Sequence, residues 1–102
     1  MDRDNRNFIE VLINIRFDTQ VRKLAGCNRM SVNVDDSASL EQIIRQVADQ
    51  GTAQLRDNLL DSQGSIRSSI LVFLDDDLVD KDKRLKLHEG SELTFSTLIS
   101  GG

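Results

Sequence analysis

The sequence predicts an α+β fold, in which a mixed sheet of four or five strands packs on one main helix. Two observations carry this prediction. Apolar residues alternate with polar ones in several short segments, which is the period of strands with one buried face. Residues 39–51 instead repeat their apolar residues every three or four positions, which is the helical period. With 102 residues and neither repeats nor a linker, the chain is expected to form one small domain.

The first two predicted strands span residues 8–17 and 30–34. In the first of them Glu10, Asn14 and Arg16 occupy one face and apolar side chains the other. The residues predicted to face inward are Ile9, Val11, Ile13, Ile15 and Phe17, and then Met30, Val32 and Val34. The connection contains Gly26 and Asn28, which favour a turn, so we expect an antiparallel hairpin.

The main helix is predicted over residues 39–51. Its apolar stripe consists of Leu40, Ile43, Ile44 and Val47. Ser39 and Gln42 fit a capping box at the start, and Gly51 is a stop signal at the end. Residues 53–64 are expected to add a short second piece of helix over the edge of the core. The residues that cover the core there are Leu55, Leu59 and Leu60.

The second half of the chain supplies the remaining strands. Residues 70–74 are apolar on both faces, as expected for a central strand, and the acidic residues 75–77 are expected to form a solvated hairpin turn. A short strand and an irregular crossing follow, with Leu78, Leu85 and Leu87 predicted as core anchors. The last strand is "SELTFSTLI", with Leu93 and Phe95 inward and Thr94 and Ser96 outward.

The element order is therefore strand, strand, helix, strand, short strand, strand. A helix with one apolar stripe needs one sheet face to cover, and this arrangement is a roll of the β-grasp kind. We expect residues 1–7 to form a disordered arm, residues 8–98 the β-grasp domain, and residues 99–102 a flexible tail.

The composition excludes several classes of function. A net charge of −4 argues against direct binding to nucleic acid or to an anionic membrane surface. Cys27 is the only cysteine and His88 the only histidine, so we expect no internal disulfide and no metal site. Residues 1–7 are charged and do not resemble a signal peptide, and no apolar run is long enough to span a membrane. A cytoplasmic protein is the simplest expectation.

"VRKLAG", "ILVFLDDDLV" and "LHEGSELTFSTLISGG" are three stretches of the sequence that resemble the MoaD/ThiS-type family of ubiquitin-like sulfur carriers. "VRKLAG" resembles the family's R-x-L-x-G turn, and "ILVFLDDDLV" resembles its third strand and hairpin. The third stretch, "LHEGSELTFSTLISGG", resembles the family's ending, which closes on Gly-Gly; Ser96 and Thr97 stand where the family often has an aromatic residue and proline. The sequence also resembles the ubiquitin-related modifier that serves tRNA thiolation.

The resemblance implies a carrier and not an enzyme. A ubiquitin-activating-type adenylating enzyme would consume ATP to adenylate the carboxylate of Gly102, and no cofactor would be bound to the chain itself. A cysteine desulfurase or rhodanese would then supply sulfur and leave a thiocarboxylate for molybdopterin synthesis, thiamin synthesis or tRNA thiolation. Glycine at positions 101 and 102 would let the chain enter a narrow catalytic channel, because glycine has no Cβ.

Residues that contact the partner enzyme are predicted at two places. Leu98, Ile99, Ser100 and Gly101 lead to Gly102 and would enter the partner with it. Leu12 and Leu71, on the outward face of the sheet, are predicted with Leu98 to form an apolar docking patch.

Two other functions remain open from the sequence. The chain could be a protein modifier of a prokaryotic conjugation system, attached through Gly102 to lysines of target proteins. Its partners would then include a conjugating enzyme and a deconjugating protease. The chain could also be a β-grasp binding module whose Gly-Gly is unused, in which case removal of the pair would leave its function intact.

Overall fold

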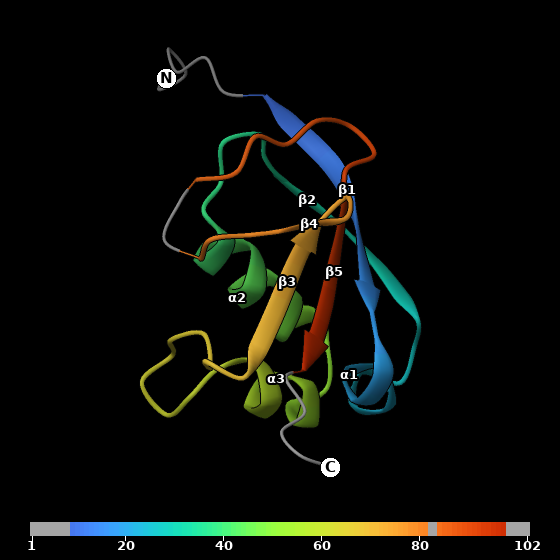
Figure 1. Ribbon diagram of the computed structural model, residues 1–102, viewed down its shortest axis with the longest axis vertical. Coiled ribbons are helices and arrows are strands. Elements are labelled where there is room, and N and C mark those ends of the chain that lie inside the picture. Colours follow the sequence, from blue (N-terminus) through green and yellow to red (C-terminus); the bar gives the residue numbers. More distant parts are fainter. Residues whose placement is uncertain (1–8, 82–83, 98–102) are drawn as a thin grey trace.

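The computed structural model describes residues 9–81 and 84–97 and contains one five-stranded sheet and three helices (Figure 1). The strands are β1 (Glu10–Phe17), β2 (Arg29–Asp35), β3 (Ile70–Leu74), β4 (Asp77–Leu78) and β5 (Glu92–Thr97). The helices are α1 (Thr19–Ala25), α2 (Leu40–Gln50) and α3 (Ala53–Leu59). The predicted α+β architecture is confirmed, whereas the predicted arm (1–7) and tail (99–102) lie outside the described residues.

The sheet is mixed, with strand order β2-β1-β5-β3-β4. The predicted hairpin of β1 and β2 is antiparallel, and its register pairs Ile13 with Val32. β5 lies between β1 and β3; it runs parallel to β1 and antiparallel to β3. The last strand in the sequence is therefore the middle strand of the sheet.

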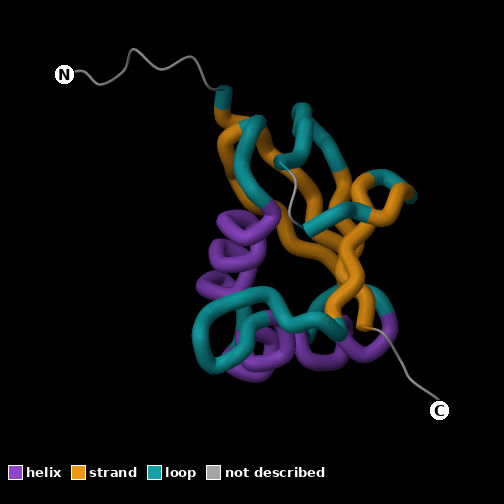
Figure 2. The backbone as a smooth tube through the Cα atoms, turned by 60° about the vertical axis from the view of Figure 1, so that its left-hand side comes forward, coloured by secondary structure: helices purple, strands orange, loops and turns teal. Residues whose placement is uncertain are grey.

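One face of this sheet is covered by the helices. Figure 2 shows α2 along the sheet and the two shorter helices at the lower end. The capping box of α2 is formed as predicted: the Gln42 backbone N–H donates to Ser39 Oγ, and the Ser39 N–H donates to Gln42 Oε1 at 2.9 Å. Leu40, Ile43, Ile44 and Val47 are all fully buried, so the stripe read from the sequence faces the core.

The connection between β1 and β2 differs from the expected turn, because it contains the helix α1. This helix buries Val21 and Ala25 and contacts β5 and α3. Seven residues are too few for a helical period to stand out in a sequence, and contacts with distant parts of the chain hold the helix in place. Gly26 ends it at a φ of 76°, a left-handed conformation that glycine adopts readily, and its N–H bonds to the Arg22 carbonyl at 3.1 Å.

Two residues predicted to face the core are exposed instead. Ile9 is 62% exposed because it precedes β1, at an end of the sheet that extends beyond the helices (Figure 1). Leu78 is 63% exposed. It pairs with Phe73, whose side chain points away from the helices, so Leu78 lies on the same uncovered side. The other two predicted anchors of the crossing, Leu85 and Leu87, are buried as expected.

Candidate functional site

The sheet face turned away from the helices, here called the open face, is not covered by any described helix and is available to a partner (Figure 2). Its side chains follow from the alternation of each strand, because every second residue of β1, β5 and β3 is buried on the helix side. The residues that point outward include Leu12, Asn14 and Arg16 of β1, Arg29, Ser31 and Asn33 of β2, Glu92, Thr94 and Ser96 of β5, and Leu71 and Phe73 of β3.

The register divides the open face into an apolar side and a basic side. Phe73 lies beside Thr94 on one side and Leu78 on the other, and Leu71 lies beside Ser96. Leu71, Phe73 and Leu78 therefore form an apolar strip on the β3–β4 side of the sheet, which runs from the level of Thr94 to the level of Ser96 in β5. Leu78 is the most exposed member of this strip.

Two arginines face each other across β1 and β2. Arg16 and Arg29 are direct cross-strand partners and both are exposed. Like charges in this position repel each other, which costs a few tenths of a kcal/mol to about 1 kcal/mol. The Glu92 carboxylate approaches Arg29 to 3.8 Å, but both side chains are partly exposed and such an ion pair contributes little. A partner with acidic groups would complement this basic pair.

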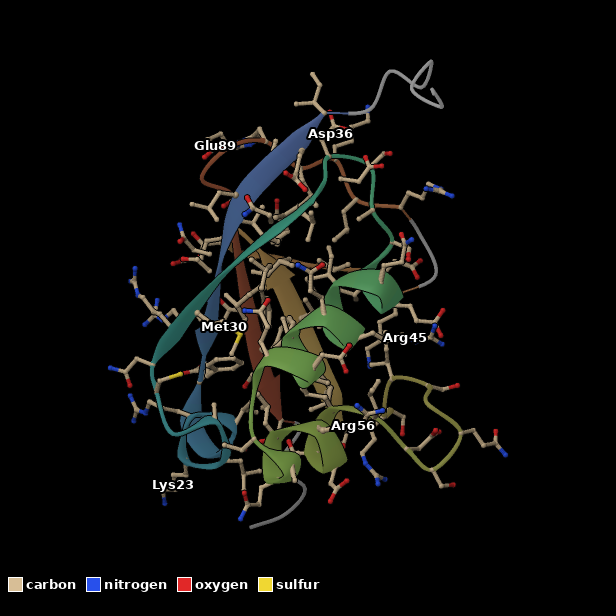
Figure 3. All side chains as sticks on the ribbon, turned by 180° about the vertical axis from the view of Figure 1, so that it is seen from behind. Lys23, Met30, Asp36, Arg45, Arg56 and Glu89 are labelled. Atoms are coloured by element: carbon tan, nitrogen blue, oxygen red, sulfur yellow. The ribbon has the colours of Figure 1, made fainter. Side chains whose placement is uncertain are left out.

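The two predicted docking residues inside the described ranges lie far apart. Leu12 accepts a hydrogen bond from Gly90 and its own N–H bonds to Glu89 Oε1, so it lies at the end of the sheet where Glu89 is seen in Figure 3. Leu71 pairs with Ser96, six positions further along the chain from Gly90. At about 3.3 Å per residue, the two leucines are separated by about 20 Å along the strands. Leu98, the third member of the predicted patch, lies outside the described residues.

The last described residues of β5 are held firmly in the sheet. Phe95 is fully buried and its ring meets Phe17 edge to face, with centroids 6.1 Å apart. Its carbonyl accepts a hydrogen bond from the Asp18 N–H at 2.9 Å, which links β5 to the start of α1. Thr97 pairs with Ile70 at the end of the ladder. The chain after Thr97 therefore starts from a fixed point, while Leu98, Ile99, Ser100, Gly101 and Gly102 lie outside the described residues.

Sequence reasoning missed two polar side chains near this point. Asn58 Oδ1 on α3 and Thr97 Oγ1 on β5 are buried without a hydrogen-bond partner. No local pattern marks either residue, because their burial results from the tertiary fold.

A cavity of about 430 Å³ lies apart from the open face and from β5. It is lined by Glu41, Ser65, Ile66, Ser68 and Lys81. Lys81 donates a hydrogen bond to the Arg67 carbonyl at 3.3 Å, and burial lowers the pKa of its ammonium group. None of these residues was predicted as a site residue.

The other singled-out residues show no sign of a reactive centre. Cys27 is free and exposed, and His88 lies in an exposed turn. Within the described ranges, no group of three or more His, Cys, Asp and Glu side chains is placed to hold a metal ion. Among the helices described here, none is both long and apolar enough to cross a membrane.

Comparison with known proteins places the fold among ubiquitin-like β-grasp proteins. The sequence matches no protein-family model and no curated protein sequence. Among solved structures, SAMP1 from Haloferax volcanii is similar with a TM-score of 0.76 and 18% identity, over 89% of this chain and 99% of that one. Urm1 from Trypanosoma brucei is similar with a TM-score of 0.68 and 19% identity, over 95% of this chain and 99% of that one.

A third similar structure is a putative molybdopterin converting factor, subunit 1, from Pyrococcus furiosus. Its TM-score is 0.66 with 13% identity, over 87% of this chain and 99% of that one. These structures confirm the predicted fold class, and they include both kinds of protein that the sequence resembles. At such low identities the likeness establishes the fold, and function has to be argued from the site.

Proposed function

We propose that this protein is a ubiquitin-like sulfur carrier whose Gly102 carboxylate is adenylated by a partner enzyme and then converted to a thiocarboxylate. The observation that carries the proposal is the placement of the sequence's Gly-Gly pair. Five residues, Leu98–Gly102, follow a strand that is fixed in the middle of a ubiquitin-like sheet. A rigid domain followed by a short glycine-ended segment suits the delivery of a carboxylate into another protein's active site.

The chemistry explains why a partner and ATP are needed. A carboxylate resists nucleophilic attack because of its negative charge. Transfer of AMP from ATP to the Gly102 carboxylate, with release of pyrophosphate, produces an acyl-adenylate that has a good leaving group. A persulfide sulfur from a cysteine desulfurase or a rhodanese then attacks the acyl carbon, and AMP leaves. Reductive cleavage of the resulting acyl disulfide by a thiol leaves the thiocarboxylate on Gly102. The protein is a co-substrate in this sequence and the catalytic groups belong to its partners.

The open face supplies the docking surface in this proposal. Five extended residues reach at most about 17 Å, so the adenylating site must lie within that distance of Thr97. Leu71 of the apolar strip lies at this end of the sheet, beside Ser96, and Phe73 and Leu78 lie about 10 Å back along the strands, at the level of Thr94. The strip is in reach of a partner that receives Gly102, and Arg16 and Arg29 would contact acidic groups beside it.

The proposal is tested with the purified protein, a ubiquitin-activating-type adenylating enzyme from the same organism, ATP and a persulfide donor. Pyrophosphate exchange by the adenylating enzyme should depend on the presence of the carrier protein. The intact mass of the carrier protein should rise by the mass difference between a sulfur and an oxygen atom. Deletion of Gly101 and Gly102 is the matched control and should abolish both signals. Intact mass also establishes whether the mature chain ends at Gly102. Exchange without any mass gain would reject the sulfur-carrier function.

The second candidate is a protein modifier. It is favoured by the similarity to the protein described as "small archaeal modifier protein 1" from H. volcanii, with a TM-score of 0.75 and 15% identity. In this case the acyl-adenylate would pass to a conjugating enzyme, and Gly102 would form an isopeptide bond with a lysine of a target. Peptide mass spectrometry that finds Gly102 on target lysines, removed by a deconjugating protease, would establish this function. An unchanged function after deletion of the glycine pair would support a binding module instead.

A further inference from the structure

One edge of the sheet ends in a long strand that has no further strand beside it among the described residues. The strand order β2-β1-β5-β3-β4 places β2 at this edge, and Figure 3 shows β2 along the outer margin of the sheet. β2 has seven residues, whereas β4 at the opposite edge has two. A long edge strand presents a row of unpaired N–H and C=O groups to which another chain can add.

The register identifies the backbone groups of β2 that face outward. The Phe17 N–H bonds to the Asn28 carbonyl at 2.9 Å, at one end of the β1–β2 ladder. Hydrogen-bonded pairs alternate along an antiparallel ladder, so the backbones of Met30 and Val32 also face β1. The N–H and C=O groups of the intervening residues therefore point away from β1 and toward the free edge. These residues are Arg29, Ser31 and Asn33, and all three are exposed.

The structure occupies only one end of this outward row. The Gln46 side chain of α2 donates to the Asn33 carbonyl at 2.8 Å and so covers the edge there. Within the described residues, the outward N–H and C=O groups of Arg29 and Ser31 and the N–H of Asn33 have no protein partner. This free stretch offers donors and acceptors in alternation, over the length of an extended segment of about five residues.

On the open-face side, the free stretch is basic. Arg29 and Ser31 project from this side, and Arg16 is the cross-strand partner of Arg29. Lys23, in the last turn of α1, adds a positive charge near the start of β2 (Figure 3). Glu92 approaches Arg29 only to 3.8 Å and leaves an excess of positive charge. Acidic side chains on an added strand would complement this charge.

On the helix side, the same stretch is apolar. Val32 is buried, and Met30 is half-buried against the core. Met30 is labelled on this side of β2 in Figure 3. Successive side chains of a strand point to opposite faces, so an added strand places alternate residues beside Arg29 and beside Met30. A segment that alternates acidic and apolar residues matches both sides of the edge.

We propose that β2 binds an extended segment of a partner protein as an additional antiparallel strand, with acidic residues alternating with apolar ones. The acidic residues exchange main-chain hydrogen bonds with Arg29 and Ser31, and their carboxylates lie on the open face beside the Arg29 guanidinium. The apolar residues between them cover the exposed part of Met30. A second copy of this chain would bring the same basic stretch to the edge and does not complement it. The site is separate from the carboxylate chemistry of the proposed function.

The probe is the acetylated and amidated peptide Glu-Val-Glu-Val-Glu, titrated into the isotope-labelled full-length protein and followed by NMR. Binding should shift the amide resonances of Arg29, Ser31 and Asn33 and slow their hydrogen exchange. In an antiparallel addition the N–H groups of the glutamates face β2 and those of the valines face away. N-methylation of the glutamates should therefore abolish binding, whereas N-methylation of the valines should preserve it.

Variants of the protein test the same edge from the other side. Ser31→Pro removes an outward N–H and leaves the hydrogen bonds to β1 in place, so it should weaken probe binding about tenfold. Ser31→Ala is the matched control and should bind as the wild type does. Arg29→Glu should also weaken binding about tenfold, and it should allow the peptide Lys-Val-Lys-Val-Lys to bind instead.

Four results would overturn the inference. They are no amide shift at millimolar probe, binding that tolerates N-methylated glutamates, unchanged affinity in Ser31→Pro or Arg29→Glu, and a dimer of the free protein that Ser31→Pro dissociates. The last result would assign the edge to a second copy of the chain. None of them bears on adenylation of Gly102, so the proposed function stands or falls separately.

Discussion

At the scale of single residues, the two-residue loop between β3 and β4 contains one aspartate whose backbone conformation is well tolerated and one whose backbone conformation is strained. Both Asp75 and Asp76 have positive φ, at 56° and 137°. Aspartate tolerates the left-handed region near 56°, and Asp75 Oδ1 also accepts a hydrogen bond from the Glu92 N–H at 3.2 Å. Asp76 lies well outside that region, in backbone space that glycine occupies far more easily.

Replacing the strained residue by glycine should stabilise the protein. The strain at Asp76 costs on the order of 1–3 kcal/mol, whereas glycine's greater freedom in the unfolded chain costs about 0.5–1 kcal/mol. Asp76→Gly is therefore expected to raise the free energy of unfolding by about 1 kcal/mol in urea titrations. Asp77→Gly is the control: Asp77 has no positive φ, so this variant should lose stability. A destabilised Asp76→Gly protein would show that the loop carries no such strain.

At the scale of elements, the start of α2 is stabilised by two hydrogen bonds that depend on each other. Ser39 and Gln42 each accept the other's backbone N–H, so removal of one side chain also loosens the other. Ser39→Ala should lower the free energy of unfolding by about 1 kcal/mol, and Gln42→Ala by less. The double variant should lose less than the sum of the two, measured as the coupling in a double-mutant cycle. Additive losses would mean that the two bonds act independently.

The elements that could be predicted are those whose burial pattern is regular over a whole segment. β1 alternates over eight residues and α2 keeps one stripe over eleven, so both could be read from the sequence. α1 could not, because among its residues whose burial is described, 21–25, only Val21 and Ala25 are buried, and the Asp18 side chain makes no cap. Contacts with β5 and α3 form this helix, and a local pattern does not contain them.

The same limit applies to the candidate site. Alternation placed Leu12 and Leu71 on the outward face, which the structure shows. It could not show that β5 would lie between their strands with a register that separates them, because strand pairing joins distant segments. Asn58 and Thr97 were missed for the same reason. Both side-chain oxygens are buried without a hydrogen-bond partner, and burial in the folded protein is not visible in a local sequence pattern.

At the scale of the whole molecule, the short reach of the final residues limits where a partner can bind. The segment after Thr97 reaches at most about 17 Å, and Leu12 lies about 20 Å from Leu71 along the strands. In the proposed function, a partner that receives Gly102 must therefore approach the end of β5, beside Leu71, and it reaches Phe73 and Leu78, at the level of Thr94, before it reaches Leu12. Contact with Leu12 would require an interface that extends over the full length of the open face.

This limit predicts that a charge at Leu78, which is nearer to the end of β5, has a larger effect than a charge at Leu12. Leu78→Asp should raise the KM for the adenylating enzyme about tenfold, since burying an aspartate in place of leucine forfeits at least 1.4 kcal/mol of docking energy. Leu12→Asp should change KM less than threefold. Leu78 and Leu12 are 63% and 40% exposed, so neither variant should alter Tm appreciably, which separates docking from folding. Equal increases in KM would instead show that the partner spans the whole face, and the reach of the final five residues would then not determine where it docks.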